Sequence, residues 1–481
     1  SAPRPLHSSS LHPAPPPSRR DMPSCRRECI AASLALLLGA DAYLPAQRAG
    51  PAAPRGSSSV RMFGPGAAAA GERIVVTGVG VVSALGNGDD FWKGLVGGKS
   101  GIDTIQGFDA SKFPTTIGAE CLDFEAKPWF ENVKNAKATD RYSHMAMAAA
   151  RMAIEEAQLP DAALQSERAA IILGTAFGGM DTFEKQHLNF DKGKKVSPFT
   201  VPALLPNTGA GILAIELGCT GPNYGVVSAC AAGSHAIGTA LRQMQYGEAD
   251  VCIVGGSEAA MTPFSYAGFS AMKAMCSSYN DAPQTASRPF DATRAGFVMG
   301  EGAGMLVLET EAHAKARGAP ILCELAGYSA TCDANHITTP HPEGAGLASC
   351  LKKALADGGV SIDEVDYINA HGTSTAYNDK FETMAIKKVF GEHAKNVPIS
   401  STKSMTGHTL GAAGGIEAAI CAKFMATGDV PPTINYATPD PECDLDYVPN
   451  AARKVLKPRA AISDNLGFGG HNAAIVFKAY E

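Results

Sequence analysis

Short apolar runs and longer amphipathic stretches alternate from residue 73 to the end of the chain. In the first part, runs rich in Val and Ile predict strands at 73–86, 169–179, 226–230, 250–259 and 304–310. Between them, apolar positions at helical spacing predict helices at 138–159 and 233–249. This alternation is typical of a sheet covered by helices.

A second series of the same kind follows. It predicts strands at 321–333, 365–375, 397–408, 460–470 and 472–480, and helices at 344–357, 380–389 and 411–427. Such alternation favours buried, mainly parallel sheets with helices on both faces. Two similar series in succession indicate a duplicated chain, with an N-terminal half at 72–320 and a C-terminal half at 321–481.

The first 71 residues are rich in Pro, Ala, Ser and Arg and show little apolar patterning, so we expect them to be disordered. Arg26 and Arg27 precede a short apolar stretch at 30–38 and small residues at 40–42, as in a secretory signal peptide. An Arg- and Ser-bearing segment follows, as in a transit peptide. We expect a bipartite presequence for a plastid reached through the secretory route. A lone secretory signal, or a true start at Met22, is the alternative.

Composition narrows the class of protein. With 481 residues, 45% of them hydrophobic, the chain can bury a large core. Its formal net charge is −6, and residues 1–71 hold 8 Arg, so the remainder is more acidic than the whole. An acidic body argues against nucleic acid as the main partner, and no apolar run is long enough to span a membrane. The cysteines after residue 71 form no CxxC pair, so we expect reduced thiols.

Cys230 lies between the apolar run VVSA and a helix-like stretch of small residues. Near the first turn of a helix, free amide groups and the helix dipole stabilise a thiolate. This position indicates a nucleophile, although a cysteine in apolar surroundings is usually an inert buried thiol. The local sequence leaves both interpretations open.

Two histidines and a lysine follow later strands. His371 stands in NAHGTST, at the end of a predicted strand. A lone histidine at a strand end is more often structural than catalytic. His408 stands five residues after Lys403, among small and apolar residues. A lysine in that setting needs an acidic partner or a chemical task. His235 falls inside the helix pattern, and we expect it to be structural.

One cysteine with two histidines suits carbon–carbon bond formation on thioesters. The thiolate takes an acyl group as a thioester, which divides one difficult step into two easier ones. The imidazoles then donate hydrogen bonds to the enolate oxygen that develops when a carboxylated second substrate loses CO2. A cysteine protease needs only one histidine with an orienting amide, so the second histidine separates the two classes.

Five sequence motifs make residues 73 to 480 resemble a known family. The family is the β-ketoacyl-acyl carrier protein synthases, specifically the type I/II elongating enzymes of dissociated fatty acid synthesis. The motifs are SACAAGSHAIG, RPFDATRAGFVMGEGAGMLVLE, NAHGTSTAYNDKFE, STKSMTGHTLGAAGGIEA and SDNLGFGGHN. The resemblance implies a thiolase-like duplicated α/β fold of two five-stranded mixed sheets with covering helices, and a homodimer. It also implies acyl and malonyl substrates carried by acyl carrier protein (ACP), with no metal and no cofactor besides the carrier's phosphopantetheine.

The resemblance also assigns roles. Cys230 would be the acylated nucleophile, His371 and His408 would support decarboxylation and condensation, and Lys403 would set the electrostatics around His408. The backbone amides of Cys230 and Phe468 would form the oxyanion hole, with the Phe468 ring as a gate. Substrate-binding roles would fall on Thr373, Thr375, His336, Thr338, Phe269 and Leu466, and supporting roles on Glu417 and Asp379.

Several positions depart from the commoner family pattern. Ala295 stands where many relatives carry an acid, Leu466 where a second Phe is frequent, and Tyr377 with Asn378 where Pro-Ala-Gly or Leu-Ala-Gly is usual. None removes a catalytic group, but they bear on loop dynamics and acyl-length preference. Phe177 is a candidate for the pocket floor, where its bulk would restrict chain length. Ordinary core packing is the alternative.

An acidic carrier protein requires a local positive surface near the active-site mouth. By position in the family pattern, the candidates are Lys134, Lys137 and Arg141, with the KGKK segment at 192–195 as an alternative. Two other functions stay open at this point. They are a non-catalytic assembly component that keeps the fold for binding, and a polyketide-type ketosynthase.

Overall fold

The computed structural model describes residues 72–481, so the presequence interpretation of 1–71 lies outside the described residues. Strands and helices alternate along this part of the chain, as the apolar pattern predicted. Within 72–481, no helix is long and apolar enough to cross a membrane.

Five strands of the first half lie side by side in the order β6, β5, β7, β8, β1. Their bounds are β1 (Ile74–Ser83), β5 (Ala169–Gly174), β6 (Asn223–Val226), β7 (Val251–Glu258) and β8 (Gly302–Thr310). β5 pairs in parallel with β6 and β7, whereas β8 is antiparallel to β7 and β1. All residues of β1, β5, β7 and β8 are buried, which explains their continuous apolar runs.

The second half repeats this arrangement in the order β11, β10, β14, β15, β9. The bounds are β9 (Cys323–Cys332), β10 (Val365–Asn369), β11 (Ile399–Ser400), β14 (Ala460–Gly467) and β15 (His471–Lys478). β10 is parallel to β11 and β14, and β15 is antiparallel to β14 and β9. Strand order and direction match between the halves, which confirms the mixed α/β fold, but the two sets of five strands belong to one continuous sheet and not to two separate sheets.

The two strand sets join at β1 and β9, which pair antiparallel through Val75 with Glu324 and Val76 with Cys323. The expectation of mainly parallel sheets is wrong, because β8 and β15 each run against both neighbours. A strand buried on both faces loses its alternation of polar and apolar residues, so its direction cannot be read from the apolar pattern.

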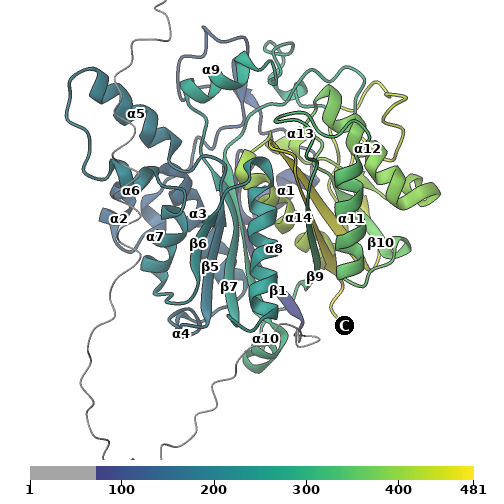
Figure 1. Cartoon of the computed structure of the whole chain (residues 1–481), viewed down its shortest axis with the longest axis horizontal. Coiled ribbons are helices and arrows are strands. Elements are labelled where there is room, and N and C mark those ends of the chain that lie inside the picture. The colour runs from purple at the N-terminus through teal and green to yellow at the C-terminus, as the bar shows by residue number, and fades with distance from the viewer. Residues whose placement is uncertain (1–71) are drawn as a thin grey trace, which may run out of the picture. The chain divides into compact units, whose positions relative to one another are not determined.

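Two central helices, α8 (Ala232–Gln245) and α14 (Ala413–Thr427), pack against each other between the two strand sets (Figure 1). α8 contacts β5, β7 and β15, and α14 contacts β7, β8 and β14. On the outer faces, α3 (Arg141–Glu156) covers β1 and β8, and α11 (Ala345–Asp357) covers β9 and β15. The segments that precede α8 and α14 carry Cys230, Lys403 and His408, and His371 follows the end of β10.

Glycines allow the central helices to approach backbone to backbone. A Cβ atom on Gly233 of α8 would lie 2.7 Å from the backbone nitrogen of Gly415 in α14. A Cβ atom on Gly415 would lie 2.4 Å from the backbone nitrogen of Gly256 in β7. The small residues of both helices therefore permit close packing that a larger side chain would block.

The remaining helices lie around this frame. They are α1 (Gly88–Val96), α2 (Val133–Ala138), α4 (Asp161–Leu164), α5 (Met180–Asp191), α6 (Thr200–Leu204), α7 (Thr208–Leu217), α9 (Pro263–Ala271), α10 (Glu311–Arg317), α12 (Ala376–Phe390) and α13 (Lys403–Thr406). Two-residue strands complete the list, namely β2 (Gly86–Asn87), β3 (Asp103–Thr104), β4 (Ile117–Gly118), β12 (Asp429–Val430) and β13 (Arg453–Lys454).

Two expected strands are shorter in the structure. The strand expected at 226–230 ends at Val226, and a 3-10 turn at Ala229–Ala231 follows it. The strand expected at 397–408 keeps only β11 before α13 begins at Lys403. In both places the chain leaves the sheet early, so the reactive residues lie on tight turns beyond the strand ends.

Candidate active site

A cavity of about 470 Å³ opens at the end of the sheet where α8 and α14 begin. Its lining includes Cys230, His371 and His408. Five of the six substrate-binding residues expected from the sequence also line it, namely Thr338, Thr373, Thr375, Phe269 and Leu466, as does the expected gate residue Phe468. Residues from both halves of the chain therefore meet in one space.

Cys230 is held on a strained turn between β6 and α8. Ala229 has a φ of 51°, which is unfavourable for a residue with a Cβ atom. This left-handed residue begins the 3-10 turn Ala229–Ala231, so that Cys230 lies two residues before α8 begins at Ala232. Its side chain lies in an apolar cluster with Phe269, Phe297 and Leu410.

The Sγ atom of Cys230 lies 3.1 Å from the Nε2 atom of His408. Burial raises the pKa of Cys230 to about 12, although Lys403 and the backbone amides of Cys230 and Phe468 lower it. The sequence suggested a thiolate stabilised by the helix terminus, but in the free protein burial outweighs these groups. Cys230 is therefore a neutral thiol, and His408 is positioned to accept its proton.

The imidazole rings of His371 and His408 lie nearly perpendicular, with their centroids 5.4 Å apart. Burial, followed by the positive charge of Lys403, holds the pKa of each histidine well below its usual range. Both rings are therefore neutral at physiological pH. A neutral imidazole can donate one hydrogen bond from the ring nitrogen that carries its proton.

Lys403 and Glu417 form a buried ion pair behind the cavity. Burial raises the pKa of Glu417, and the adjacent ammonium of Lys403 opposes that rise. The Nδ2 atom of Asn465 donates to the second carboxylate oxygen of Glu417 at 2.6 Å. The lysine thus has the acidic partner that its apolar sequence context required.

Two buried carboxyl groups hold the backbone beneath His371. The amides of His371 and Gly372 donate to the two oxygens of Glu382 at 2.6 and 2.8 Å. Asp464 accepts from the amide of His371 at 3.4 Å, and burial together with this like-charged neighbour raises the pKa of Glu382. Glu382, Asp464 and Asn465 were not predicted as site residues, although Glu382 stands in NAHGTSTAYNDKFE and the other two in SDNLGFGGHN.

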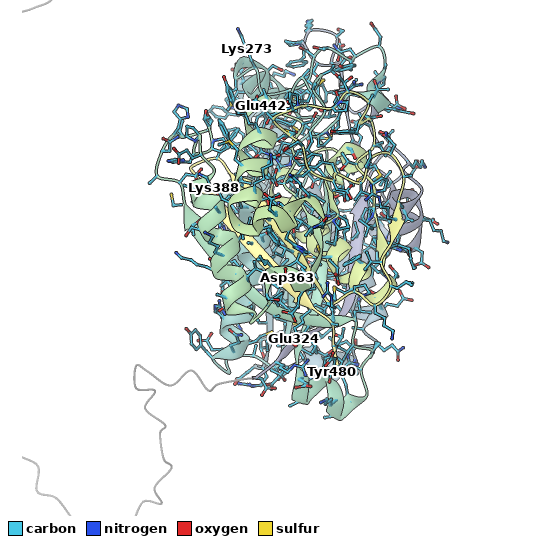
Figure 2. All side chains as sticks on the ribbon, turned by 90° about the vertical axis from the view of Figure 1, so that its right-hand side faces the viewer. Lys273, Glu324, Asp363, Lys388, Glu442 and Tyr480 are labelled. Carbon is cyan, nitrogen blue, oxygen red and sulfur yellow. The ribbon has the colours of Figure 1, made fainter. Side chains whose placement is uncertain are left out.

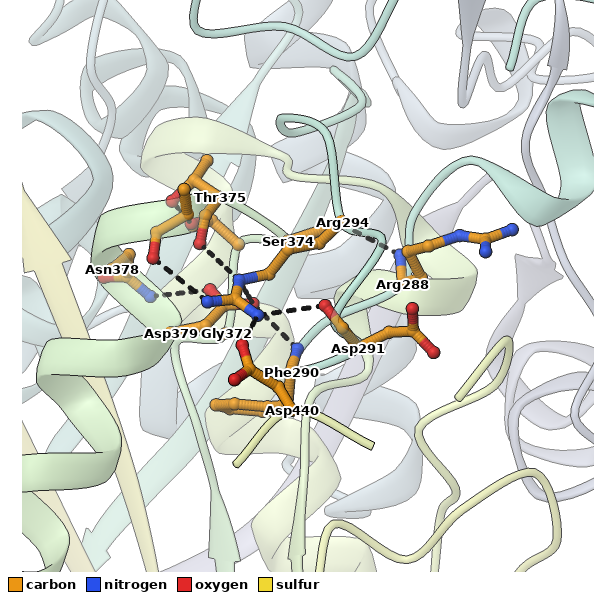
Figure 3. Close-up of polar contacts among 12 residues, drawn as sticks. Arg288, Phe290, Asp291, Arg294, Gly372, Ser374, Thr375, Asn378, Asp379 and Asp440 are labelled. Atoms are coloured by element: carbon orange, nitrogen blue, oxygen red, sulfur yellow. Dashed lines mark hydrogen bonds and ion pairs between the residues drawn. The ribbon is translucent and has the colours of Figure 1, made fainter. Parts of the chain in front are cut away.

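Asp379 is fully buried in a network around Arg294 (Figure 3), and the side-chain amide of Asn378 links it to Glu382 by donating to both carboxylates. It accepts from the backbone amide of Phe290 at 2.8 Å and lies 3.8 Å from Arg294. Arg294 donates to the backbone carbonyl of Thr375 at 3.0 Å and to Asp440 at 2.6 Å. Through Arg294, Asp379 supports the segment that carries Thr373 and Thr375, and it does not line the cavity.

The segment after β14, which contains the expected gate residue Phe468, is hydrogen-bonded to the loop after β9. The amide of Gly469 donates to the carbonyl of Ile337 at 2.7 Å. The amide of Asp333 donates to the carbonyl of Gly470 at 2.8 Å. The ring of Phe468 lies 6.5 Å from that of Phe269. His336 is exposed and outside the cavity lining, and its Nδ1 atom accepts from backbone amides of its own turn.

The expected docking residues divide into two kinds. Lys134 and Lys137 are exposed on α2. Arg141 makes a two-point contact with Glu301 at 2.7 and 2.9 Å, so its charge is neutralised within the protein. A further cation, Lys273, lines the cavity mouth and was missed by the sequence analysis. Figure 2 shows Lys273 at the opposite end of the molecule from Tyr480.

Two further aromatic residues from the sequence analysis, His235 and Phe177, lie outside the cavity lining. His235 lies outside the cavity lining, where its Nδ1 atom contacts the hydroxyl of Ser228 at 2.6 Å and its ring packs against Tyr328. It is structural, as expected. Phe177 is about 39% exposed and packs edge-on against Phe269 at 6.2 Å. It does not line the cavity directly, but it lies behind a ring that does.

Comparison with known proteins matches this geometry to a family. Residues 71–314 match the family model "Beta-ketoacyl synthase, N-terminal domain", and residues 322–437 match "Beta-ketoacyl synthase, C-terminal domain". A 3-oxoacyl-[acyl-carrier-protein] synthase 2 of Synechocystis is 49% identical over 413 residues, covering 85% of this chain and 99% of the relative. One from Staphylococcus aureus (strain COL) is 47% identical with the same coverage.

Solved structures of ketosynthases also match this chain. One chain matches this protein with a TM-score of 0.78 and 36% sequence identity, and the match covers 85% of this chain and 100% of that chain. It comes from the structure of a type II PKS acyl-carrier protein in complex with its ketosynthase bound to the hexaketide. A beta-ketoacyl synthase from Burkholderia phymatum gives a TM-score of 0.79 at 32% identity with the same coverage. This chain belongs to the beta-ketoacyl synthase family.

Proposed function

We propose that this protein catalyses the decarboxylative condensation of malonyl-ACP with an acyl chain bound to Cys230, lengthening fatty acids by two carbons. The observation that carries the proposal is the convergence of the Cys230 thiol, His408 and His371 in one cavity. No cofactor is required, because the carrier's phosphopantetheine arm holds both substrates as thioesters.

In the first step, Cys230 takes the acyl group. Its thiol proton passes to Nε2 of His408 as the sulfur attacks the thioester carbonyl of acyl-ACP. The amides of Cys230 and Phe468, which already face the sulfur, would hold the oxyanion. The carbon–sulfur bond to the carrier breaks, and the departing thiolate of phosphopantetheine takes the proton from His408.

In the second step, malonyl-ACP enters and loses CO2. Neutral His371 donates a hydrogen bond to the thioester oxygen, where negative charge develops as the carbon–carbon bond to the carboxylate breaks. His408 donates a second hydrogen bond once its neutral ring carries its proton on Nε2, the nitrogen that accepted the Cys230 proton in the first step. The resulting carbanion attacks the acyl carbonyl on Cys230, and the sulfur leaves as a thiolate. Thr373 and Thr375, whose hydroxyls lie 2.9 Å apart at the cavity, would bind the phosphopantetheine arm.

The test follows both steps on purified protein. Intact-mass measurement should show one acyl group after incubation with acyl-ACP, and none for Cys230→Ala. His371→Ala should still be acylated but should lose CO2 release from malonyl-ACP. Retained acyl transfer by Cys230→Ala would defeat the proposal.

A polyketide-type ketosynthase is the second candidate, because a chain of a type II PKS ketosynthase complex and one of the ishigamide ketosynthase/chain length factor match the fold with TM-scores of 0.78 and 0.80. Sequence identity favours fatty acid elongation, since those chains are 35 to 36% identical and the 3-oxoacyl-ACP synthases 47 to 49%. A non-catalytic assembly role does not account for a thiol placed against His408. Rates with saturated acyl-ACP, compared with β-ketoacyl-ACP, separate the two enzymes.

We also propose that the carrier protein docks beside the cavity mouth, with Lys273 as the central cation and Lys134 and Lys137 as further contacts. Lys273 is exposed and lines the mouth, where the carrier's phosphate and acidic surface would arrive. Lys273→Glu should raise KM for acyl-ACP and change kcat little. The same reversal at Lys93, exposed on α1, is the control. Equal KM values for the two variants would defeat this assignment.

A homodimer is part of the proposal. β6 ends one side of the sheet, so one edge of its backbone has no strand partner among the described residues. Exposed apolar side chains stand on and near β6, α5 and α6, namely Val227, Phe183, Leu188, Phe190, Phe199 and Val201. An apolar patch beside an open strand edge suits an isologous contact between two copies. Sedimentation equilibrium of wild type and Phe190→Glu would test it, with a monomeric wild type contradicting it.

We propose the plastid as the site of action, on sequence grounds alone. Residues 1–71 combine a signal-like apolar stretch with an Arg- and Ser-bearing segment that follows it. A fluorescent protein fused to residues 1–71 should reach the plastid in an alga with complex plastids. A fusion to residues 43–71, which lacks the apolar stretch, should not. Secretion of the first fusion would favour a lone signal peptide.

A further inference from the structure

Asn465 connects the buried ion pair to His371. It lies on β14, opposite Ala473 of β15, and is fully buried. Its Nδ2 atom donates to Oε2 of Glu417 at 2.6 Å and lies 3.3 Å from Nδ1 of His371. Its Oδ1 atom accepts from the hydroxyl of Ser234 on α8. Every polar atom of the amide group therefore has a partner.

These partners fix which end of the amide faces the histidine. Lys403 pairs with Glu417 and keeps it a carboxylate, which can only accept hydrogen bonds. Glu417 must therefore face the NH2 group of Asn465, and the hydroxyl of Ser234 satisfies the carbonyl oxygen. One hydrogen of the NH2 group goes to Glu417, and the other points to Nδ1 of His371.

The second hydrogen decides the tautomer of His371. An N–H donor cannot share its hydrogen bond with another N–H, so Nδ1 must be the unprotonated nitrogen. Because burial and Lys403 keep this imidazole neutral, its single proton then sits on Nε2. His371 lines the cavity, and its Nε2 atom has no hydrogen-bond partner recorded among residues 72–481. The N–H is therefore free for a substrate oxygen.

We propose that Asn465 is a positioning residue, which fixes His371 as the Nε2–H tautomer so that it can donate to the thioester oxygen of malonyl-ACP. The assignment deepens the proposed function and rests on it for the identity of the acceptor. Glu382 holds the backbone of His371, whereas Asn465 orients the ring and sets its proton. Ser234 and Glu417 act through Asn465, because they hold the two ends of its amide group.

Two substitutions test the proposal. Asn465→Asp replaces the donor with an oxygen that accepts, so it should favour a proton on Nδ1 and remove the donor from the cavity. Asn465→Leu removes the hydrogen bond while keeping the volume. For both, malonyl decarboxylation should fall roughly 100- to 1,000-fold, the range for loss of one preorganised donor, while acylation of Cys230 stays within about threefold.

A matched control separates positioning from stability. Asn369 is also fully buried, on β10, and its amide donates to the hydroxyl of Tyr367 at 3.0 Å. Asn369→Leu should lower the free energy of unfolding as Asn465→Leu does, but it should not change the ratio of decarboxylation to acylation. Equal effects of the two variants on that ratio would reduce Asn465 to packing and overturn the proposal.

The tautomer itself can be observed without turnover. In protein labelled with 15N-histidine, two-bond proton–nitrogen correlations distinguish the two neutral forms, and His371→Gln identifies the signals of His371. Wild type should show the Nε2–H pattern, and Asn465→Asp should show the Nδ1–H or doubly protonated pattern. A wild-type Nδ1–H pattern would overturn the proposal. If the protein formed no carbon–carbon bond at all, the proposed function would fail while this measurement still gave its answer.

Discussion

The Nε2 atom of His408 lies 3.1 Å from the Sγ atom of Cys230, although 178 residues separate them in the chain. Each residue lies on the turn that precedes a central helix, α8 for Cys230 and α14 for His408. Because α8 and α14 pack against each other, the duplicated fold brings the two turns together. The duplicated fold therefore creates this pair, and no local sequence pattern predicts the contact.

The raised pKa of Cys230 predicts how its reactivity depends on pH. The thiol is neutral in the free protein because burial raises its pKa to about 12. Alkylation by iodoacetamide should therefore keep rising from pH 7 to pH 10, since only the thiolate reacts. A thiolate–imidazolium pair would instead reach its plateau near pH 6 to 7. The alkylation rate of Cys230 is measured by peptide mass analysis in a Cys332→Ser variant, because the exposed thiol of Cys332 would also react with iodoacetamide.

Removal of Lys403 should destabilise the protein in a pH-dependent manner. Lys403 and Glu417 are 2% and 3% exposed, so Lys403→Met leaves a buried carboxylate without its partner. Loss of one member of such a pair costs about 3–5 kcal/mol in free energy of unfolding. In this variant the folded pKa of Glu417 rises further above the unfolded value. Stability should therefore fall as pH rises from 5 to 8.

Urea unfolding at the two pH values checks this. The double variant Lys403→Met with Glu417→Leu removes both charges, so it should be more stable than Lys403→Met at pH 8 and should lose the pH dependence. Identical urea midpoints for Lys403→Met at pH 5 and pH 8 would show that Glu417 does not carry an uncompensated charge.

Element types and the reactive set were predictable from the sequence because their signals are local. Buried strands such as β7 give continuous apolar runs, and Cys230, His371, Lys403 and His408 stand in motifs of distinctive residue types. Strand direction was not predictable, because burial on both faces erases the polar alternation. α5 was not predicted, and none of its twelve residues is buried, so it lacks a clear apolar stripe.

Electrostatic detail at the site depended on contacts between distant segments. Asn465 and Glu382 look like ordinary polar residues of a strand and a helix, and only the fold places them against His371. Arg141 looked like a free surface cation, but its partner Glu301 is 160 residues away. For the same reason, the sequence could place Cys230 near a helix terminus but could not predict that burial keeps its thiol neutral.

Close packing of the central helices predicts a strong effect of a single methyl group. In Gly415→Ala, the new Cβ atom would lie 2.4 Å from backbone atoms of Gly256 and Gly304. Backbone cannot move aside as a flexible side chain can, so the free energy of unfolding should fall by about 1–3 kcal/mol or more. Gly211→Ala in α7 is the control, because nothing lies within 4 Å of its added Cβ atom. It should be neutral or slightly stabilising.

Phe177 is placed to influence which acyl chains are accepted. Its ring packs edge-on against Phe269, which lines the cavity and in turn contacts Phe297 at 5.4 Å. Phe177→Ala would let Phe269 move away from Cys230 and lengthen the apolar space available to the acyl chain. Across a series of saturated acyl-ACP substrates, the longest chain accepted should therefore increase. Phe264→Ala, which removes an exposed ring on α9, should leave the profile unchanged. If Phe177→Ala instead lowers all rates by one common factor, Phe177 is a packing residue and the pocket-floor assignment is wrong.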